Sequence, residues 1–425
     1  MNQTKKINIQ LKHLLAIPSL FHLGIYLLFL LIVPTAFGQT TITLEAAIDT
    51  ALRNNLQIKN EKLRAMYQQK LMHTGIDLPQ ANLSLEAGQI NSYYKDNRVG
   101  LSQAFSFPTV YTKQKTLLEE YWKTAVIVVA VREVEIRKTV SEIFYKIILL
   151  RQKEKLLQKA DSNYAEFLTK AMMRFEQGES NLLEKITAEN QRGSIQLQLK
   201  ALLQELEITQ LQFQLLLNVT IAYRPESPDS KYGLPNGYEI NKIIQHPSLA
   251  LLHQQKMSTS AGVFLEKARL LPDLSVGVFN MSMQGTGSND VVYNRSTRFS
   301  SAQISVGVPL FFGAQKGKIK AAQANEVLAR NLYLEQKQVL ESHYQSAVSR
   351  YKNQLEAAMY YEKTALPNAE TLINAANQQF VAGEINYLDW VILNNQAIEI
   401  ESNYLEVLKA LNETSIEINY LTSKN

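Results

Sequence analysis

The sequence predicts an α+β fold in which one plan occurs twice along the chain: a helix, a β-hairpin and a long α-hairpin. Three observations predict it. Two similar segments lie at a constant offset of 205 residues, two regions alternate apolar with small or polar residues, and long stretches after them contain little proline. Alternation with a period of two is typical of strands, whereas an apolar stripe repeating every three or four residues is typical of helices.

The beginning of the chain has the pattern of a secretory signal. Three lysines precede the apolar run LGIYLLFLLIV, which is followed by PTAFGQ. A basic leader, an apolar segment and small residues before a cut are the three parts of such a signal. We therefore expect residues 1–38 to be a signal peptide, with Ala36 and Gly38 just before the cut. A retained membrane anchor is the alternative.

After this leader we divide the chain into a first repeat (39–223), a linker (224–239) and a second repeat (240–425). The linker RPESPDSKYGLPNGYE is rich in Pro and Gly, as connections commonly are. Each repeat is expected to contain a helix that ends at a Leu-Pro pair, at Pro79 and at Pro272, because proline disfavours the helical conformation in the residue before it. These two pairs mark the points where helices give way to strands.

A β-hairpin is expected after each of these helices, at about 80–108 and about 273–311. The apolar residues that alternate with small or polar ones are Leu83, Leu85 and Ala87, then Val99, Leu101, Phe105 and Phe107, and in the second repeat Leu274, Val276, Val278, Ile304, Val306 and Val308. Strands of about ten residues are long enough to cross a bilayer when tilted. The second hairpin carries a 12-residue insertion within a segment rich in Gly, Ser and Asn, which we interpret as a loop.

Long helices are expected after each hairpin. Residues 109–223 contain no proline, and their only glycines are Gly178 and Gly193. The roughly 60 residues before Gly178 would form a helix on the order of 90 Å long. A helix of that length cannot fit inside a globule, so it is expected to turn at Gly178 and pair with the next helix. The second copy is expected to turn at Gly383, with a kink at Pro367.

The two expected turns carry similar sequences, RFEQGESNLLEKITAENQ and QFVAGEINYLDWVILNNQ. At the offset of 205, the first turn's Phe175, Gly178, Glu179, Asn181 and Glu184 correspond to Phe380, Gly383, Glu384, Asn386 and Asp389. Glycine allows the chain to reverse with a positive φ. The repetition indicates that both turns do the same work.

Composition argues against several other functions. The chain contains no Cys, which excludes disulfides and thiolate metal sites, and its net charge of +5 comes without a block of Lys or Arg, so no nucleic-acid partner is expected. No two-histidine metal motif or phosphate-binding loop is present. We expect no enzyme activity and no cofactor. His253 and Met257, four residues apart on an expected helix, could bind a soft metal, and Met281 and Met283 share a strand face. A packing or surface position is the better interpretation of each.

Four strands cannot close a barrel, and open strand edges are not tolerated in hydrocarbon. If these strands lie in a membrane, several chains must share one barrel, and three copies would supply twelve strands. Tyr93 and Tyr94 then fit either an interfacial aromatic belt or an exposed loop.

The chain resembles the TolC family of outer-membrane efflux proteins over essentially all of its length after the leader. The resemblance rests on TLEAAIDTALRNN near the start of the first repeat, the two Leu-Pro strand entries, LSQAFSF and GVPLFF, and the two F-x-x-G-E-x-N turns. It implies a homotrimer with a shared 12-stranded barrel in the outer membrane and a helical barrel of coiled α-hairpins reaching into the periplasm. It also implies a passive exit duct that works with a periplasmic adaptor protein and an inner-membrane pump of the RND or ABC type.

The resemblance assigns roles to the turns. Gly178, Glu179, Asn181, Gly383, Glu384 and Asn386 would contact the adaptor at the tips of the hairpins. Glu184 and Asp389 would lie near the constriction of the tunnel, where a ring of three Asp389 carboxylates would concentrate cations and raise their own pKa values. The alternative is that both acids simply stabilise the beginning of the next helix. Ile385 stands where TolC has a gating arginine, so the closed state is expected to use other ion pairs.

Two other classes of protein remain as alternatives: a periplasmic adaptor and a structural coiled-coil protein of the envelope. Adaptors have similar α-hairpins but lack two β-hairpins of bilayer length, and a structural coiled coil would need heptads without intervening strands. Within the duct interpretation, drug efflux, metal efflux and type I protein secretion are not separated by the sequence, because the pump and not the duct selects the cargo.

Overall fold

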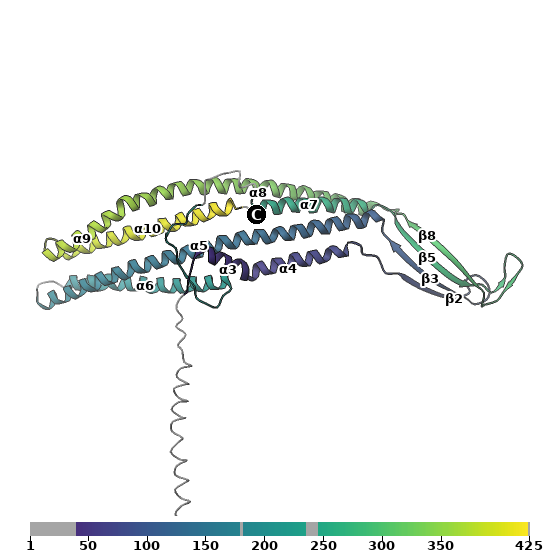
Figure 1. Cartoon of the computed structure of the whole chain (residues 1–425), viewed down its shortest axis with the longest axis horizontal. Helices are drawn as coiled ribbons and strands as arrows, with labels where there is room; N and C mark the ends of the chain where they lie inside the picture. Colours follow the sequence, from purple (N-terminus) through teal and green to yellow (C-terminus); the bar gives the residue numbers. More distant parts are fainter. Residues whose placement is uncertain (1–39, 179–181, 235–244, 424–425) are drawn as a thin grey trace, which may run out of the picture.

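The computed structural model of the chain describes residues 40–178, 182–234 and 245–423. The described part is elongated, with helices along most of its length and a β-sheet at one end (Figure 1). Some sequence expectations fall outside these ranges, namely the signal peptide (1–38), Glu179 and Asn181 at the first turn, and residues 235–239 of the linker. They stay predictions.

The first half begins with two helices, one strand pair and a very long helix. Its elements are β1 (Thr41–Ile42), α3 (Leu44–Asn54), α4 (Leu56–Leu71), the 3-10 turn η1 (Met72–Gly75), β2 (Asn82–Gly88), β3 (Asp96–Phe105), α5 (Pro108–Glu176), α6 (Leu182–Leu217) and β4 (Arg224–Pro225). At 1.5 Å per residue, the 69 residues of α5 extend about 100 Å. The turn at Gly178 lies between α5 and α6, as the sequence predicts.

The second half repeats this order of elements. It comprises α7 (Pro247–Ala268), β5 (Asp273–Ser282), β6 (Gly285–Thr286), β7 (Val292–Tyr293), β8 (Arg298–Gly307), α8 (Gly313–Tyr360), the π turn η3 (Tyr361–Ala365), α9 (Leu366–Ala382) and α10 (Tyr387–Leu421). The π turn ends just before Pro367, which lacks the N–H that a continuous α-helix needs there. The segment expected to be a loop contains the short ladder of β6 and β7.

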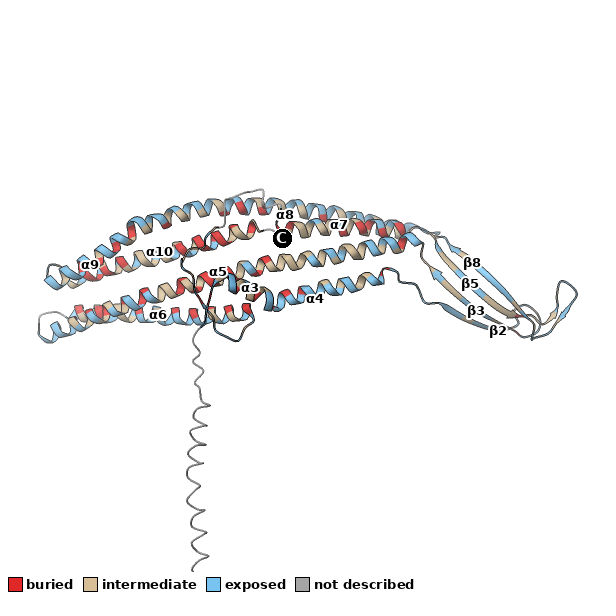
Figure 2. Ribbon diagram, in the orientation of Figure 1, coloured by how far each residue is buried: buried red, intermediate tan, exposed pale blue. Residues whose placement is uncertain are grey.

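The helices lie side by side in a curved layer (Figure 1). The long helix α5 contacts α4 and α6 on one side and α7 and α10 on the other, and α8 in turn contacts α7 and α10. Buried positions face neighbouring helices, and exposed ones line the outer surface (Figure 2). Within residues 40–178, 182–234 and 245–423, none of the helices combines the length and the apolar character of a membrane span.

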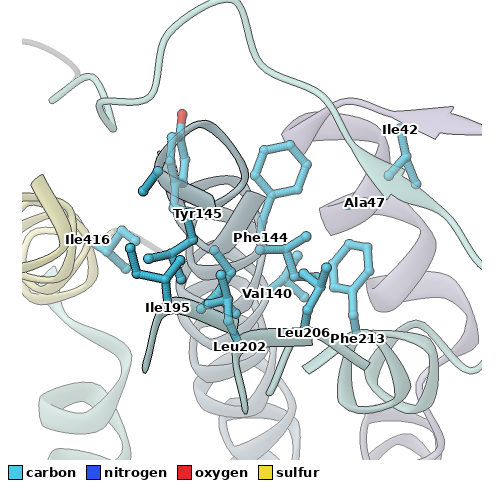
Figure 3. Packing of buried hydrophobic residues seen from close by; sticks show 14 of the residues in the cluster. Ile42, Ala47, Val140, Phe144, Tyr145, Ile195, Leu202, Leu206, Phe213 and Ile416 are labelled. Carbon is cyan, nitrogen blue, oxygen red and sulfur yellow. The ribbon is translucent and has the colours of Figure 1, made fainter. Parts of the chain in front are cut away.

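The core is built on the apolar stripe that the sequence predicts for α5. Ile136, Val140, Phe144 and Ile147 recur at spacings of three and four and are at most 4% exposed. They meet side chains of α3 and α6, with Phe144 edge-on to Phe213 at 6.4 Å between ring centroids (Figure 3). Such spacing keeps one face of a helix against its neighbours, so α5 serves as the central support of the helical layer.

The four longer strands form one antiparallel sheet in the order β2-β3-β5-β8. The two predicted hairpins therefore join through β3 and β5, with Leu101 opposite Val278. Because side chains alternate across a sheet, one face carries the apolar set, and it is open: Leu85 is 74% and Ile304 79% exposed. On the opposite face, the ring of Phe279 lies across Gly100, where a Cβ would collide with it, and close to Gly277.

Candidate functional site at the helical tips

The two helix turns lie together at the end of the molecule farthest from the sheet (Figure 1). One joins α5 to α6 and the other joins α9 to α10. Both glycines adopt the left-handed conformation that the sequence predicts, with φ of 72° at Gly178 and 76° at Gly383. A side chain at either position would carry a backbone cost of about 1–2 kcal/mol, which explains why glycine stands at both.

The second turn is held by hydrogen bonds of its own backbone and of Asn386. The N–H of Glu384 donates to the carbonyl of Gln379 at 2.9 Å, which closes the end of α9. Asn386 caps α10: its Oδ1 accepts a hydrogen bond from the N–H of Asp389 at 2.9 Å. Asn386 therefore has a structural role in addition to any contact with a partner, since an N-cap amide satisfies a donor that the helix leaves free.

The two acidic residues differ in their surroundings. Asp389 is exposed, in the first turn of α10. Glu184 is buried in the first turn of α6, and its Oε1 lies 3.5 Å from Nη1 of Arg174 on α5. Both positions suit a carboxylate at a helix N-terminus, as the alternative interpretation expects. Within one chain, Asp389 is open to solvent and Glu184 is not. A carboxylate that lines a constriction must be exposed, so Asp389 fits that role better than Glu184.

An aromatic cluster that the sequence analysis missed joins the two hairpins near their tips. Trp390 of α10 stacks on Phe167 of α5, with ring centroids 4.4 Å apart and planes at 15°. Tyr164 meets Trp390 edge-on at 5.6 Å, and Phe380 of α9 lies 5.4 Å from Phe167. Trp390 Nε1 donates to Asn377 Oδ1 at 2.8 Å. The only sequence signal is a pair of aromatics three residues apart on α5, which does not reveal its partners.

A surface pocket lies beside this cluster, between the two hairpins. Its lining comes from α5, α9 and α10 and comprises Asn163, Glu166, Phe167, Lys170, Asn377, Phe380, Val381 and Trp390. The charged pair in its wall is Glu166 with Lys170, at 2.8 Å. Aromatic side chains beside a few polar ones are typical of surfaces that accept another protein, and this one lies near the predicted adaptor-contact residues.

A second set of contacts joins Lys231, in the connection between the two halves of the chain, to the π turn η3. Nζ of Lys231 lies 2.6 Å from Oε1 of Glu362 in the π turn, and the hydroxyl of Tyr404 on α10 donates to the same oxygen at 2.8 Å. Burial alone would raise the pKa of Glu362, but the hydrogen bonds from Lys231 and Tyr404 outweigh it and lower that pKa. These contacts hold α10 against the one place where the long second helix departs from α geometry.

Other candidate residues are placed in packing or loop positions. His253 lies edge-on to Tyr333 at 6.1 Å, and the sulfur of Met281 accepts a hydrogen bond from Asn91. No three His, Cys, Asp or Glu side chains of the described residues are grouped to hold a metal ion. Tyr93 and Tyr94 lie on the connection between β2 and β3 and are exposed.

Comparisons with known proteins agree with this architecture. Residues 241–422 match a family described as outer membrane efflux protein. The cobalt-zinc-cadmium resistance protein CzcC of Cupriavidus metallidurans is 23% identical over 279 residues. That match covers 64% of this chain and 64% of CzcC, which is just under two thirds of the relative's length.

Solved structures share the fold at low sequence identity. The structure of CusC, which is described in terms of folding and transmembrane channel formation, superposes with a TM-score of 0.74 at 15% identity and covers 90% of this chain and 92% of CusC. The outer-membrane channel OprN gives a TM-score of 0.77 at 16% identity, with 90% of both chains covered.

A layer of long α-hairpins that ends in a four-stranded sheet defines the chain as a protein of the TolC-like outer-membrane channel fold. The match of residues 241–422 to the outer membrane efflux protein family, together with the shared channel fold, confirms the resemblance seen in the sequence. The matched family and the channel fold together indicate a location in the outer membrane, with the helical part on the periplasmic side. The family is one of channels and not of enzymes, in agreement with the expectation of no catalytic site.

Proposed function

We propose that the chain is the outer-membrane exit duct of a tripartite efflux system: a homotrimer that passively conducts cargo delivered by an inner-membrane pump and a periplasmic adaptor. The observation that carries this proposal is the incomplete sheet. Strands β2 and β8 each have one neighbour within the described chain, and the sheet is open on both sides. Unpaired strand edges are costly in hydrocarbon, and three chains would provide the twelve strands of a closed barrel.

The helical layer supports the same assembly. Its outermost helices expose large apolar side chains away from the intrachain core: Leu197, Leu211 and Leu215 on α6, Leu63, Met66 and Tyr67 on α4, and Val327, Leu328 and Leu334 on α8. Exposed apolar sets of this size are typical of surfaces that another chain covers. We infer that one edge of the layer packs against the opposite edge of the next protomer, so that the helices close into a tunnel.

The tips are proposed to be the contact with the adaptor and the narrowest part of the tunnel. Gly178 follows α5, and Gly383, Glu384 and Asn386 lie between α9 and α10, in the turns at the end of the helical layer (Figure 1). The pocket of Phe167, Phe380 and Trp390 is formed by α5, α9 and α10 themselves. Glu179 and Asn181 stay part of this proposal by their positions in the sequence. Three copies of the exposed Asp389 around one axis would favour cations over anions. Buried Glu184, near Arg174, would shape the tip instead.

For the cargo we propose metal ions ahead of drugs or secreted proteins. The support is the curated relative, whose name describes resistance to cobalt, zinc and cadmium. CusC and OprN share the fold of this chain at only 15% and 16% sequence identity. The fold by itself therefore does not favour one cargo. A duct needs no metal site of its own for this work.

The first test is assembly and location. The full chain is expressed with its leader, inner and outer membranes are separated, and the mass of the detergent-solubilised protein is measured by light scattering. We expect about three chains per particle in the outer-membrane fraction. A monomer in the periplasmic fraction would overturn the duct proposal and favour the adaptor alternative.

The second test is ion selectivity in a planar bilayer. Asp389→Asn should lower the ratio of cation to anion permeability, because it removes one carboxylate per chain from the proposed constriction. Glu384→Gln, a neighbouring exposed acid on the same turn, is the matched control. Equal effects of both variants would mean that Asp389 contributes only to the general surface charge.

Cargo is tested by growth. A host that lacks its own metal-efflux duct but keeps a metal-efflux pump and its adaptor is supplied with this chain. It is challenged with cobalt, zinc and cadmium salts, and in parallel with hydrophobic drugs. Restored tolerance to the metals alone supports the proposed cargo. Restored tolerance to the drugs alone would assign the duct to drug efflux.

A further inference from the structure

The open apolar face of the sheet ends in a single charged side chain. Along most of its length this face carries exposed apolar side chains, namely Leu83, Leu85, Val99, Leu101, Val276, Val278, Ile304 and Val306. By the pairing register, Asn280 and Ser300 lie level with Val99. One step farther from the helices come Asn97 on β3 and Arg298, which lies opposite Ser282. Arg298 is the one charged residue on this face of the four strands.

Arg298 is held in place by neighbouring strands. Its Nε donates to Oδ1 of Asn280 at 2.6 Å, and its Nη1 donates to Oδ1 of Asn97. Asn280 in turn donates to the hydroxyl of Ser300 at 3.0 Å. A guanidinium has five N–H donors in a fixed plane, and these two amides occupy only part of them. The side chain is thus oriented by the sheet and still has donors for another group.

No carboxylate offsets this charge among the described residues. Arg98 on the opposite face pairs with Glu86 at 3.7 Å, whereas the acceptors of Arg298 are neutral amides. An exposed, pre-oriented arginine without a counter-ion is suited to a planar, charge-assisted contact with a phosphate.

The position of Arg298 relative to a membrane follows from the direction of the sheet. The strands leave the helical layer at Asp273 and Gly307 and end beside the outer loops at Ser282 and Arg298 (Figure 1). With the helices in the periplasm, Arg298 lies at the outer boundary of the apolar band. The outer leaflet of an outer membrane is built from phosphorylated glycolipid, whose phosphates lie at that boundary.

We propose that Arg298, with Asn97 and Asn280, binds a phosphate of the lipid A headgroup in the outer leaflet. This proposal rests on the proposed function, because it requires the apolar face to lie against lipid. The bound lipid would seal the outer rim of the shared barrel at β8, which is an edge strand in the single chain. Basic side chains at the membrane boundary are a common means of binding lipid headgroups.

The test is lipid retention measured by native mass spectrometry. The full trimer is placed in nanodiscs of phosphatidylethanolamine that contain bis-phosphorylated lipid A, and the fraction of particles released with bound lipid A is compared among variants. Arg298→Gln should lower lipid A affinity by about tenfold or more, as expected for the loss of a charge-assisted hydrogen bond. Dephosphorylated lipid A should bind wild type and variant equally.

Two further variants keep the result interpretable. Asn97→Asp preserves size and places a carboxylate beside Arg298, so it should lower retention while leaving the sheet intact. Arg295→Gln removes an arginine from the adjoining loop and should change nothing. Equal retention by wild type, Arg298→Gln and Asn97→Asp in a trimer that fractionates with the outer membrane would overturn the lipid site alone. Failure to insert or to form trimers, for the wild-type chain, would overturn the duct proposal and the lipid site together.

Discussion

The junction between the two hairpins rests on Trp390, and its replacement is a direct test of the tip. The indole is 4% exposed, stacks on Phe167 and donates to Asn377. Because these three residues belong to α10, α5 and α9, loss of the ring removes packing from both hairpins at once. We expect Trp390→Ala to loosen the tips and Trp390→Phe to do so only slightly.

The magnitudes follow from the contacts. Removing a buried Trp side chain costs roughly 3–5 kcal/mol. Trp390→Phe keeps a ring on Phe167, and an aromatic pair is worth about 0.5–1.5 kcal/mol beyond its buried area. It loses the hydrogen bond to Asn377, which is worth about 1 kcal/mol; Asn377 is exposed, so water can replace that partner. The phenylalanine variant should therefore retain most of the junction.

Hydrogen exchange of the backbone amides in α9 and α10 measures this local effect. Since about 1.4 kcal/mol corresponds to a factor of ten, Trp390→Ala should speed exchange near the tip by about a hundredfold or more where local opening governs it. Trp390→Phe should give less than about tenfold by the same relation. In planar bilayers, Trp390→Ala should show a higher conductance, or more frequent changes of conductance, than the wild type.

The chain contains one other tryptophan, Trp122 in α5, on the part of that helix nearer the sheet. Trp122→Phe is the matched control and should leave exchange at the tip unchanged. If Trp390→Ala leaves tip exchange within about twofold of wild type, a difference below 0.5 kcal/mol, the aromatic cluster does not hold the hairpins together and the reasoning is wrong.

Three further predictions concern stability. Gly383→Ala should lower the free energy of unfolding by about 1–2 kcal/mol, because φ at that position is 76°. Gly193→Ala should raise it by about 0.4–1 kcal/mol, because Gly193 lies in the helix α6 with open space for a Cβ. Thermal unfolding of the two trimers measures the difference. Gly100→Ala should reduce the yield of folded trimer, since its Cβ would lie 2.5 Å from Cδ1 of Phe279, and pairing it with Phe279→Leu should restore the yield if that clash is the cause. Burial lowers the pKa of His246, so the unfolded chain takes up a proton first as pH falls below about 6.5 and stability decreases there. His246→Asn, which retains an N-cap acceptor, should flatten the melting temperature between about pH 7 and pH 5; an unchanged slope would show that other groups set it.

The local periodicity of the sequence determined most of the secondary structure of this protein. The alternation of Val276 and Val278 with small residues predicts a strand, the stripe through Val140 and Phe144 predicts one face of a long helix, and the two repeated glycines predict left-handed turns. All of these are as expected. Each depends on the geometry of the backbone over a few residues, and that geometry is the same wherever the segment lies in the fold.

Only the tertiary structure decided which of these elements meet. The contact of Trp390 with Phe167 joins positions more than two hundred residues apart, and Arg298 reaches Asn97 because β5 lies between β3 and β8. Neither contact has a local signal, because the free energy that selects it comes from burial and strand pairing summed over the whole sheet and helical layer. The sequence by itself therefore determined the kinds of element and their turns. The long-range packing determined the junction at the tips and the arginine at the outer rim.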